Sequence, residues 1–569
     1  MIGGLHVGLT RPGDLRHGAN GIRPGGQMTR TSADFHVGTA CLFRVRGHER
    51  NPLPVRRTPG GLPAVPVRRC PVQRGPGLRP TTDPVSFDDR INAVVAPVSS
   101  FLSGVVFASL PVGGVPVPLI VVWLLVAAIV CTVAFRFVNL TGFWHAIQIV
   151  RGRFDTPTAD TPGTITHFQA LSTAVSGTVG LGNIAGVAVA ISLGGPGATF
   201  WMILAGLLGM STKFVECTLG VKYRQIQPDG RVDGGPMFYL RDGLAELGRA
   251  RLGRVMASVF AVCMVFASLG GGNMFQSNQA FQQLVNATGG ATSPLAGNGW
   301  MAGLVLAALV GAVILGGIRS IANVTGKLVP LMAVLYVGSV TVILILNASA
   351  IPGALAAIVQ GAFSPQGVAG GVIGVMIQGI RRATFSNEAG IGTASIAHSP
   401  VKTQRPVTEG FVGLLEPFID TVVICTMTAL AIVVTGSYTV SGLDGVGITD
   451  TAFRTVAPWF SWLLTLAVLM FAYSTMISYA YYGTRAVRYL FGPNELVTNV
   501  FKGVFLLFIV IGASMDLGAV IDFSDAMLFT MSIPNIIGLY LLIPVVKREL
   551  ANYRADLQAG RVRPATPGQ

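Results

Sequence analysis

Long apolar runs separated by short polar connections dominate the chain from residue 91 onward. A run of about 20 apolar residues crosses the roughly 30 Å of membrane hydrocarbon as a helix. Such runs lie at 117–135, 168–192, 197–220, 255–285, 298–317, 326–347, 367–398, 407–436, 459–484, 501–514 and 523–546. A further apolar stretch, 91–112, contains Pro97 and Pro111, which favours an interfacial helix. The pattern predicts an all-α integral membrane protein with about 11 transmembrane helices.

The composition agrees with this pattern. Of 569 residues, 51% are hydrophobic and 11% are charged, and the mean hydropathy is +0.61. Soluble domains carry about 25% charged residues. The six cysteines form no CxxC pair, so neither a disulfide framework nor a metal site of that kind is expected. Without a GxxxxGK(S/T) motif, ATP hydrolysis is not expected either, and we predict that the protein is not an enzyme.

The first 90 residues form an Arg/Pro/Gly-rich extension. Residues 1–96 contain fourteen Arg, no Lys and six Asp or Glu, without hydrophobic periodicity, which is typical of disorder. The extension lacks the interleaved aromatics of a nucleic-acid-binding arm. It also lacks the apolar centre of a signal peptide. We therefore predict a disordered segment over 1–90 that binds no nucleic acid.

Basic residues alternate between successive connections. Lys and Arg gather in every second one, at 136–166, 221–254, 318–327, 399–406, 485–502 and the tail 547–569. The intervening connections contain only Arg454. Because Lys and Arg concentrate in cytoplasmic loops, the C-terminus is predicted to be cytoplasmic in a plasma (inner) membrane protein. The basic extension would then lie outside, against the rule. Either it is translocated against its charge or the start is misassigned, and we favour a misassigned start with Val85 as the candidate first residue.

Two of the apolar runs are interrupted by glycine and polar residues. The first break is Ser176–Asn183, with Gly177, Gly180 and Gly182, and the second lies within 378–393. A broken helix survives in a membrane only where protein or a water-filled cavity satisfies its backbone groups. The structural alternative is that these glycines only allow close helix packing.

Each break lies in the first of five consecutive apolar runs. Because five is an odd number of crossings, the second set of five would cross the membrane in the opposite direction to the first. This arrangement is typical of inverted-repeat transporters. The predicted organisation is an interfacial helix, one transmembrane helix and a cytoplasmic loop over 91–166, five-helix repeats over 167–348 and 366–546, and a cytoplasmic tail over 547–569.

Several ordered motifs resemble the alanine/glycine:cation symporter family. They are Thr178–Val187 followed by Gly194–Gly197, Gly209–Cys217, Gly234–Leu240, Phe385–Gly390, Ile396–Ser399 and Phe418–Thr421. The resemblance covers about 91–546 and has no counterpart for 1–90. It implies a LeuT-like core with a 5+5 inverted repeat and one extra N-terminal helix. It also implies uptake of alanine or glycine driven by sodium, or in some members by protons.

A zwitterionic substrate needs partners for its carboxylate and its ammonium. Unpaired N–H groups at a half-helix N-terminus suit a carboxylate, and we expect Gly180, Leu181 and Gly182 to supply them. The ammonium is assigned to carbonyls and polar side chains around the second break. The full set of candidate substrate-binding residues is Thr178, Gly180, Leu181, Gly182, Asn183, Asn273, Gln276, Phe281, Gln378 and Thr384. Of these, Asn273 and Gln276 share a helical face, in a Gly-Asn-Met-x-Gln pattern that also occurs in the family.

Sodium is the expected coupling ion. The first break also resembles the first broken helix of the neurotransmitter:sodium symporters, which implies a Na⁺ site at the carbonyls of Ser176 and Val179. By the same resemblance the pair Ser474-Thr475 supplies hydroxyl ligands, although such hydroxyls often bond only their own helix. A second Na⁺ site would use the Thr178 carbonyl and the Asn183 side chain. Membrane lipid is the other expected partner, and the oligomeric state is left open.

The ionisable residues inside the apolar runs have simpler expected roles. Lys213 and Glu216 are expected to pair on one helix face, and Glu388 to pair with Arg381 or Arg382. His167 and His398 are placed at the interface. Asp420 is either structural or a proton site. The alternatives to a sodium symporter are a proton-coupled symporter, a non-transporting amino-acid sensor and a channel.

Overall fold

Helices account for nearly all of the regular structure. The computed structural model describes residues 87–154, 161–227, 231–364, 368 and 370–562. Most of the extension 1–90, and with it the expectation of a misassigned start, lies outside the described residues. Its last four residues do not fit the predicted disorder, because helix α1 begins at Phe87.

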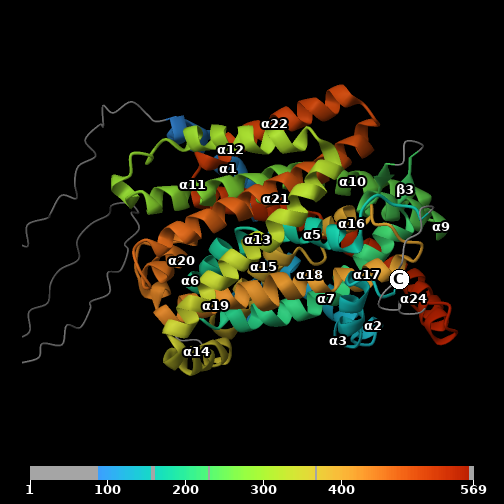
Figure 1. Ribbon diagram of the computed structural model, residues 1–569, viewed down its shortest axis with the longest axis horizontal. Coiled ribbons are helices and arrows are strands. Elements are labelled where there is room, and N and C mark those ends of the chain that lie inside the picture. Colours follow the sequence, from blue (N-terminus) through green and yellow to red (C-terminus); the bar gives the residue numbers. More distant parts are fainter. Residues whose placement is uncertain (1–86, 155–160, 228–230, 365–367, 369, 563–569) are drawn as a thin grey trace, which may run out of the picture. The chain divides into compact units, whose positions relative to one another are not determined.

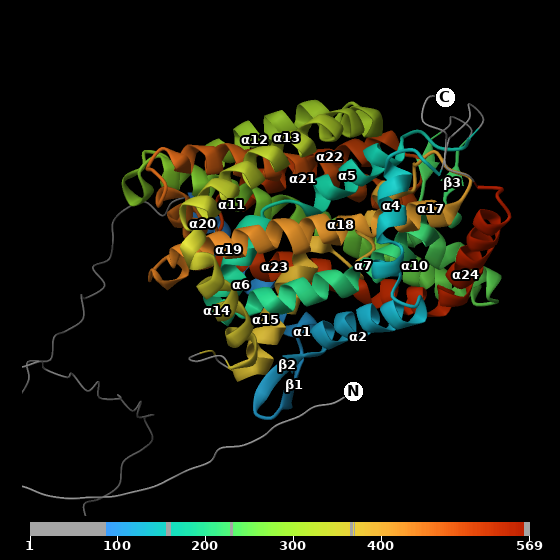
Figure 2. The ribbon, with the colours of Figure 1, turned by 60° about the horizontal axis from the view of Figure 1, so that its bottom comes forward.

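The first described elements are α1 (Phe87–Val106), the antiparallel strands β1 (Ser109–Val112) and β2 (Val115–Pro118), α2 (Leu119–Ala134), α3 (Val138–Thr141) and α4 (Phe143–Val150). Helices α1 and α2 and the β-hairpin lie along one side of the helical unit, whereas α4 lies beside α17 (Figure 2). The β-hairpin turns through Gly113 and Gly114, both at positive φ. It was not expected, because Pro111 was read as a helix interruption. Proline is tolerated at such a sheet edge.

The first predicted repeat contains the following elements, in chain order: α5 (His167–Thr178), η1 (Gly182–Gly186), α6 (Val187–Gly194), α7 (Ala198–Lys222), β3 (Gln225–Ile226), β4 (Val232–Asp233), α8 (Pro236–Phe238), η2 (Tyr239–Gly243), α9 (Leu244–Glu246), α10 (Ala250–Leu269), η3 (Gly270–Met274), α11 (Phe275–Ala287), η4 (Gly290–Thr292), α12 (Gly299–Ile314) and α13 (Gly317–Leu346). Segments η1, η2 and η3 are π-helical turns.

The second predicted repeat and its approach contain η5 (Ala348–Ala350), α14 (Ile351–Phe363), α15 (Gly371–Asn387), α16 (Thr393–His398), α17 (Pro406–Gly413), α18 (Leu415–Pro417), the π-helical η6 (Phe418–Cys425), α19 (Thr426–Thr435), η7 (Ser437–Thr439), α20 (Gly445–Arg454), α21 (Phe460–Phe491), α22 (Glu495–Ala513), α23 (Leu517–Thr530) and α24 (Ser532–Gln558). Helices α14 and α20 occupy two connections that were predicted as loops.

Every predicted apolar run contains helix, but the runs differ in their ability to span a membrane. In the described part of the chain, seven helices are long and apolar enough, and the bent pair α5/η1–α6 is an eighth candidate. The other three predicted runs correspond to α2 and α12, which are 16 residues long, and to the interrupted α15–α16. The protein is therefore a mostly helical membrane protein.

Both predicted breaks are present. Helix α5 starts at a capping box, in which the Gln169 N–H donates to Thr166 Oγ1 (3.2 Å) and the Thr166 N–H to Gln169 Oε1 (3.0 Å). Its continuation beyond Thr178 is bent by 53°. Helix α15 ends at Glu388, whose φ of 56° is left-handed, and Gly390 and Gly392 also have positive φ. The glycines are required there because side chains rarely adopt that conformation.

The two interrupted helices are tied together at the ends that were predicted to be cytoplasmic. The segment before α5 pairs with the segment after α16 through a parallel bridge between Ile165 and Val401. The Arg224 guanidinium, just beyond α7, donates to the carbonyls of Pro162, Ser399, Val401 and Thr403 at 2.5–2.9 Å. One cation thus satisfies carbonyls from both connections. Figure 1 shows α5, α16 and α17 gathered in this region.

Close backbone contact between α7 and α14 generates a stability prediction. A Cβ added to Gly197 would lie 2.1 Å from the Gly361 carbonyl carbon, and backbone atoms cannot move aside as a side chain can. We expect Gly197→Ala to destabilise the protein by about 1–3 kcal/mol. The measurement is the melting temperature in detergent. Gly326→Ala on α13, where a Cβ meets nothing within 4 Å, is the matched control. Equal melting temperatures for the two variants would contradict the packing argument.

Candidate functional site

Side chains accept hydrogen bonds from two of the backbone N–H groups that the first break frees. In a continuous helix the Gly180 N–H would donate to the Ser176 carbonyl. Here it donates to Asn183 Oδ1 (3.0 Å), and the Leu181 N–H donates to Gln276 Oε1 (3.0 Å). Gln276 Nε2 is fixed in turn by the Gly271 carbonyl (2.9 Å). In this conformation Gly180 and Leu181 therefore present no free donors to a ligand.

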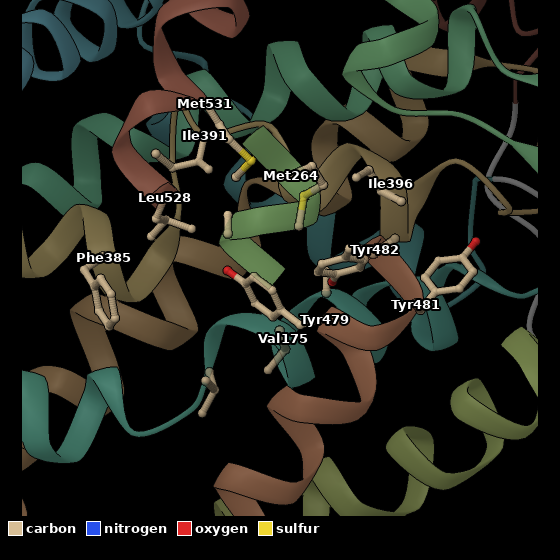
Figure 3. Close-up of a cluster of buried hydrophobic side chains, with 14 of the residues drawn as sticks. Val175, Met264, Phe385, Ile391, Ile396, Tyr479, Tyr481, Tyr482, Leu528 and Met531 are labelled. Atoms are coloured by element: carbon tan, nitrogen blue, oxygen red, sulfur yellow. The ribbon is translucent and has the colours of Figure 1, made fainter. Parts of the chain in front are cut away.

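A small cavity lies beside this break. Its volume is about 10 Å³, which is about the room that one water needs. Three candidate substrate residues line it, Thr178, Gly182 and Gln276, together with the candidate sodium ligand Thr475. The rest of the lining was not predicted and consists of Gly177, Gly271, Phe385, Glu388, Tyr479 and Leu528. Figure 3 shows Phe385, Leu528 and Tyr479 on three different helices.

The glycine run before Gln276 explains how the Tyr479 ring reaches the cavity. A Cβ on Gly272 would lie 1.9 Å from Tyr479 Cγ, and a Cβ on Gly271 would lie 3.5 Å from the Phe385 ring. Any side chain at Gly272 would displace Tyr479. The sequence did contain a signal for this close contact, namely the run Gly270–Gly272 shortly before the polar residues of α11. The partner ring, more than 200 residues away, could not be identified from it.

A buried carboxylate joins the two breaks. Asn183 Nδ2 donates to Asp420 Oδ1 (2.6 Å), and Asp420 Oδ2 accepts from Ser386 Oγ (2.8 Å) and Thr421 Oγ1 (2.7 Å). Asn183 belongs to η1 of the first broken helix and Ser386 to α15 of the second. Asp420 itself lies in η6 and is fully buried. Single π-helical turns are frequent at functional sites, and η1, η3 and η6 all contribute to this region.

Oxygen atoms gather around the Ser176 carbonyl. It accepts from Thr475 Oγ1 (3.1 Å) and from Ser474 Oγ (3.4 Å) on α21. Ser176 Oγ lies 3.0 Å from the Ser474 carbonyl, and Ser478 Oγ lies 3.1 Å from Ser176 Oγ. Carbonyl and hydroxyl oxygens of this kind suit Na⁺, so the residues present fit that ion. Ser478 was not predicted, although it lies one helical turn beyond Ser474.

Comparison with known proteins gives the family. The model of the sodium:alanine symporter family matches residues 109–566. The chain belongs to this family. It is therefore a multi-pass membrane protein of a family of sodium-coupled amino acid symporters, and not an enzyme.

Two relatives with assigned names align with most of this chain. The sodium/alanine symporter AgcS of Methanococcus maripaludis is 38% identical over 436 residues, which are 76% of this chain and 93% of that protein. The probable sodium/glutamine symporter GlnT of Bacillus subtilis is 34% identical over 445 residues, 78% and 89% of the two chains. Among solved structures, MhsT in complex with L-phenylalanine matches with a TM-score of 0.43 and 15% identity, over 68% of this chain and 99% of that one.

Seven of the ten candidate substrate residues are not in the cavity lining: Gly180, Leu181 and Asn183 belong to the first break, and four others lie elsewhere. Asn273 Nδ2 donates to the Phe505 carbonyl on α22 (2.6 Å), and Phe281 packs in an apolar cluster with Val285. Gln378 lies beside Gly194, at the far end of α6. Thr384 is buried, and its carbonyl accepts from the Glu388 N–H (2.9 Å). In this conformation these contacts position helices.

The ionisable residues pair differently from the sequence expectation. Lys213 Nζ bonds Glu416 Oε1 (3.0 Å) on α18, and Glu216 accepts from Asn535 (2.8 Å). Arg381 (2.7 Å) and Arg382 both bind Asp525 on α23. Glu388 instead accepts from Tyr479 and Thr393. The predicted pairs were wrong because the nearest charge along the helix was chosen, whereas packing gives Lys213, Arg381 and Arg382 ionic partners that lie 143–203 residues away in the sequence.

Gln276 provides the first test of the site. Gln276→Leu removes the acceptor of the Leu181 N–H and leaves a buried donor unsatisfied, which costs about 1–3 kcal/mol. We expect a lower melting temperature together with altered substrate binding. Gln282→Leu is the matched control, because Gln282 is exposed on the same helix and bonds only Asn286 (3.2 Å). A Gln276→Leu variant that melts and binds like the control would show that Gln276 does not support the break.

Proposed function

We propose that the protein imports alanine or glycine together with Na⁺ by alternating access. The observation that carries the proposal is the small cavity between two interrupted helices, which Asn183, Asp420 and Ser386 connect through hydrogen bonds. Glycines at 177, 182 and 271 form part of its wall. Walls without side chains suit a substrate with a small side chain. The name of the archaeal relative, a sodium/alanine symporter, agrees with this choice.

The substrate carboxylate would bind the N–H groups of the first break. Since Gln276 Oε1 and Asn183 Oδ1 occupy two of these groups, the carboxylate would take their place as the cavity opens. The substrate ammonium would lie toward the second break, where the Glu388 carboxyl lines the cavity. The substrate carboxylate would thus meet N–H donors, and the substrate ammonium would meet the Glu388 carboxyl.

Na⁺ would be held between the first break and α21. The Ser176 carbonyl and the hydroxyls of Ser474 and Thr475 already converge, and the Val179 carbonyl would complete the set. A Na⁺ ion there would contact both the first broken helix and α21. Its binding energy would therefore favour the arrangement of these two helices in which the site is complete. We leave the second predicted Na⁺ site, at the Thr178 carbonyl and Asn183, as a proposal with less support, because Asn183 Oδ1 bonds the Gly180 N–H.

The membrane arrangement follows from the charge of the connections. We propose two inverted five-helix repeats, 167–348 and 366–546, each opened by an interrupted helix. The tail 547–569 would be cytoplasmic in the inner membrane, because the connections on its side carry nearly all of the loop Lys and Arg.

Uptake of labelled alanine into proteoliposomes tests the proposal, with an inward Na⁺ gradient compared with an equal K⁺ gradient. We expect concentrative uptake with Na⁺ alone, reduced by excess glycine but not by bulky amino acids. Uptake that follows a pH gradient instead would make the protein a proton-coupled symporter. Alanine binding without net flux would indicate a sensor, and flux that ignores opposing gradients would indicate a channel.

Thr475 tests the sodium site. Thr475→Val keeps the shape of the side chain and removes the hydroxyl, so we expect the Na⁺ concentration for half-maximal uptake to rise about tenfold, equivalent to about 1.4 kcal/mol. Competition by other amino acids should stay unchanged. Thr484→Val is the control, because the Thr484 hydroxyl bonds only the Ala480 carbonyl of its own helix (2.7 Å). An unchanged Na⁺ dependence in Thr475→Val would remove this residue from the site.

Gly182 tests the substrate pocket. A Cβ there would lie 3.3 Å from Ser386 Cα and 3.5 Å from the Phe385 ring, so the branched side chain of Gly182→Val would fill the cavity. We expect alanine binding to fall at least about tenfold while the protein remains folded. Gly186→Val, where a Cβ meets nothing within 4 Å, should bind normally. Normal binding by Gly182→Val would place the carboxylate elsewhere.

A further inference from the structure

A buried chain of ionisable groups lies apart from the cavity, where α5, α7, α16, α17 and α18 meet (Figures 1 and 2). Glu409 on α17 is its centre. One carboxylate oxygen contacts His167 Nδ1 at the start of α5, and the other contacts His398 Nδ1 at the end of α16 (2.5 Å). The His398 and Glu409 side chains are fully buried, and His167 is 6% exposed. Both histidines were expected near the membrane interface, and the structure shows that their side chains are buried within the protein.

The contacts of Glu409 determine which ring nitrogens carry hydrogen. An ionised carboxylate only accepts hydrogen bonds, so His398 Nδ1 must donate. If His398 is neutral, its single ring hydrogen is on Nδ1, and Nε2 is a bare acceptor. His167 donates to the same carboxylate through its own Nδ1.

His398 Nε2 faces a second carboxylate. Glu416 Oε2 lies 3.9 Å away, and both atoms are buried without a hydrogen-bond partner among the described residues. Glu416 Oε1 forms an ion pair with Lys213 Nζ (3.0 Å). A bare nitrogen would thus face an anionic oxygen with no hydrogen between them. A hydrogen on Nε2 would turn two facing acceptors into a donor and an acceptor.

The charges of the group lead to the same conclusion. With neutral histidines, the Lys213 ammonium and the carboxylates of Glu409 and Glu416 add up to a net charge of −1, and all three side chains are fully buried. A proton on His398 makes it neutral, which a buried site strongly favours. Among the described residues, the neighbouring titratable groups are Glu216 and Cys217 on α7, Glu388 after α15, Tyr239 in η2, and Tyr479 and Tyr482 on α21, and the Arg224 guanidinium bonds the carbonyl of Ser399, the residue after His398.

We propose that this group is a binding site for a proton, held on His398 Nε2 and directed at Glu416 Oε2. The bound proton links α16, the second half of the second interrupted helix, to α18 and through Lys213 to α7. Glu409 extends the link to α5, the first half of the first interrupted helix. Release of the proton separates α16 from α18, because the two facing acceptors then repel each other. The occupancy of the site is independent of the proposed transport function, whereas its effect on uptake rests on that function.

The protonation state can be measured directly by solid-state NMR of ¹⁵N-histidine-labelled protein in lipid bilayers. His398→Asn keeps a hydrogen-bond donor in the place of Nδ1, so it should preserve the contact with Glu409. The signals that disappear from the spectrum of this variant are those of His398. We expect both ring nitrogens of His398 to carry hydrogen at about pH 7. Glu416→Gln, which removes the facing charge, should convert that histidine to the neutral form. If His398→Asn does not fold, the histidine that responds to Glu416→Gln gives the assignment.

A neutral His398 with a bare Nε2 at that pH would overturn the proposal. So would a Glu416→Gln spectrum in which no histidine changes its protonation state.

Alanine uptake under a fixed Na⁺ gradient measures the consequence for transport. Between about pH 6 and about pH 8, we expect wild-type uptake to vary several-fold and His398→Asn uptake to be flat. His145→Gln is the control, because His145 lies on α4 and its Nε2 contacts Tyr553 (2.8 Å), outside the group. A wild-type pH profile in His398→Asn would overturn the link to transport. Absence of alanine uptake in the wild type at every pH would contradict the proposed function and leave the NMR result standing.

Discussion

A helix that is interrupted inside a membrane must find partners for the backbone groups that the interruption frees, because hydrocarbon offers none. Much of the arrangement around the first break follows from this constraint. The Leu181 N–H requires Gln276 from α11, the Gly180 N–H requires Asn183, and the Ser176 carbonyl is met by hydroxyls of α21. Asn183 belongs to the broken helix itself, but Gln276 and the hydroxyls come from α11 and α21, which must therefore lie close to the break.

Buried charge imposes the second constraint. Lys213 has Glu416, Arg381 and Arg382 share Asp525, and Asp420 accepts three neutral donors. A charge without a partner would be expensive in this environment. These pairs therefore fix the register between helices that are distant in sequence. His398 and Glu416 depart from this pattern, since their facing atoms have no partner within the described residues.

The sequence predicted the helical membrane class, both breaks and the pairing of Ser176 with Ser474 and Thr475, because these follow from local composition and from motifs. It did not predict Tyr479 and Phe385 at the cavity, or Asp525 as the partner of two arginines. Aromatic residues in apolar helices carry no mark that separates a pocket wall from ordinary packing. An ion pair between two residues that are 143 positions apart also leaves no periodic pattern in the sequence from which it could be predicted. Helices α14 and α20 were missed because they are short and lie in segments whose glycine and proline content resembles loops.

The occupied N–H groups of the first break bear on how substrate binding and conformational change are connected. A carboxylate that took the place of Gln276 Oε1 would exchange one acceptor for another at the Leu181 N–H, so that contact alone would contribute little net energy. The released Gln276 amide would have to find new partners, since its Nε2 already holds the Gly271 carbonyl of η3. Binding at α5 would therefore move η3, against which the Tyr479 ring packs without an intervening side chain. Tyr479 contacts Glu388 at the second break, so a change at one interrupted helix reaches the other through a continuous set of contacts. A ligand shifts such an equilibrium only by its difference in affinity for the two arrangements, so that difference must come from contacts beyond the exchange at the Leu181 N–H.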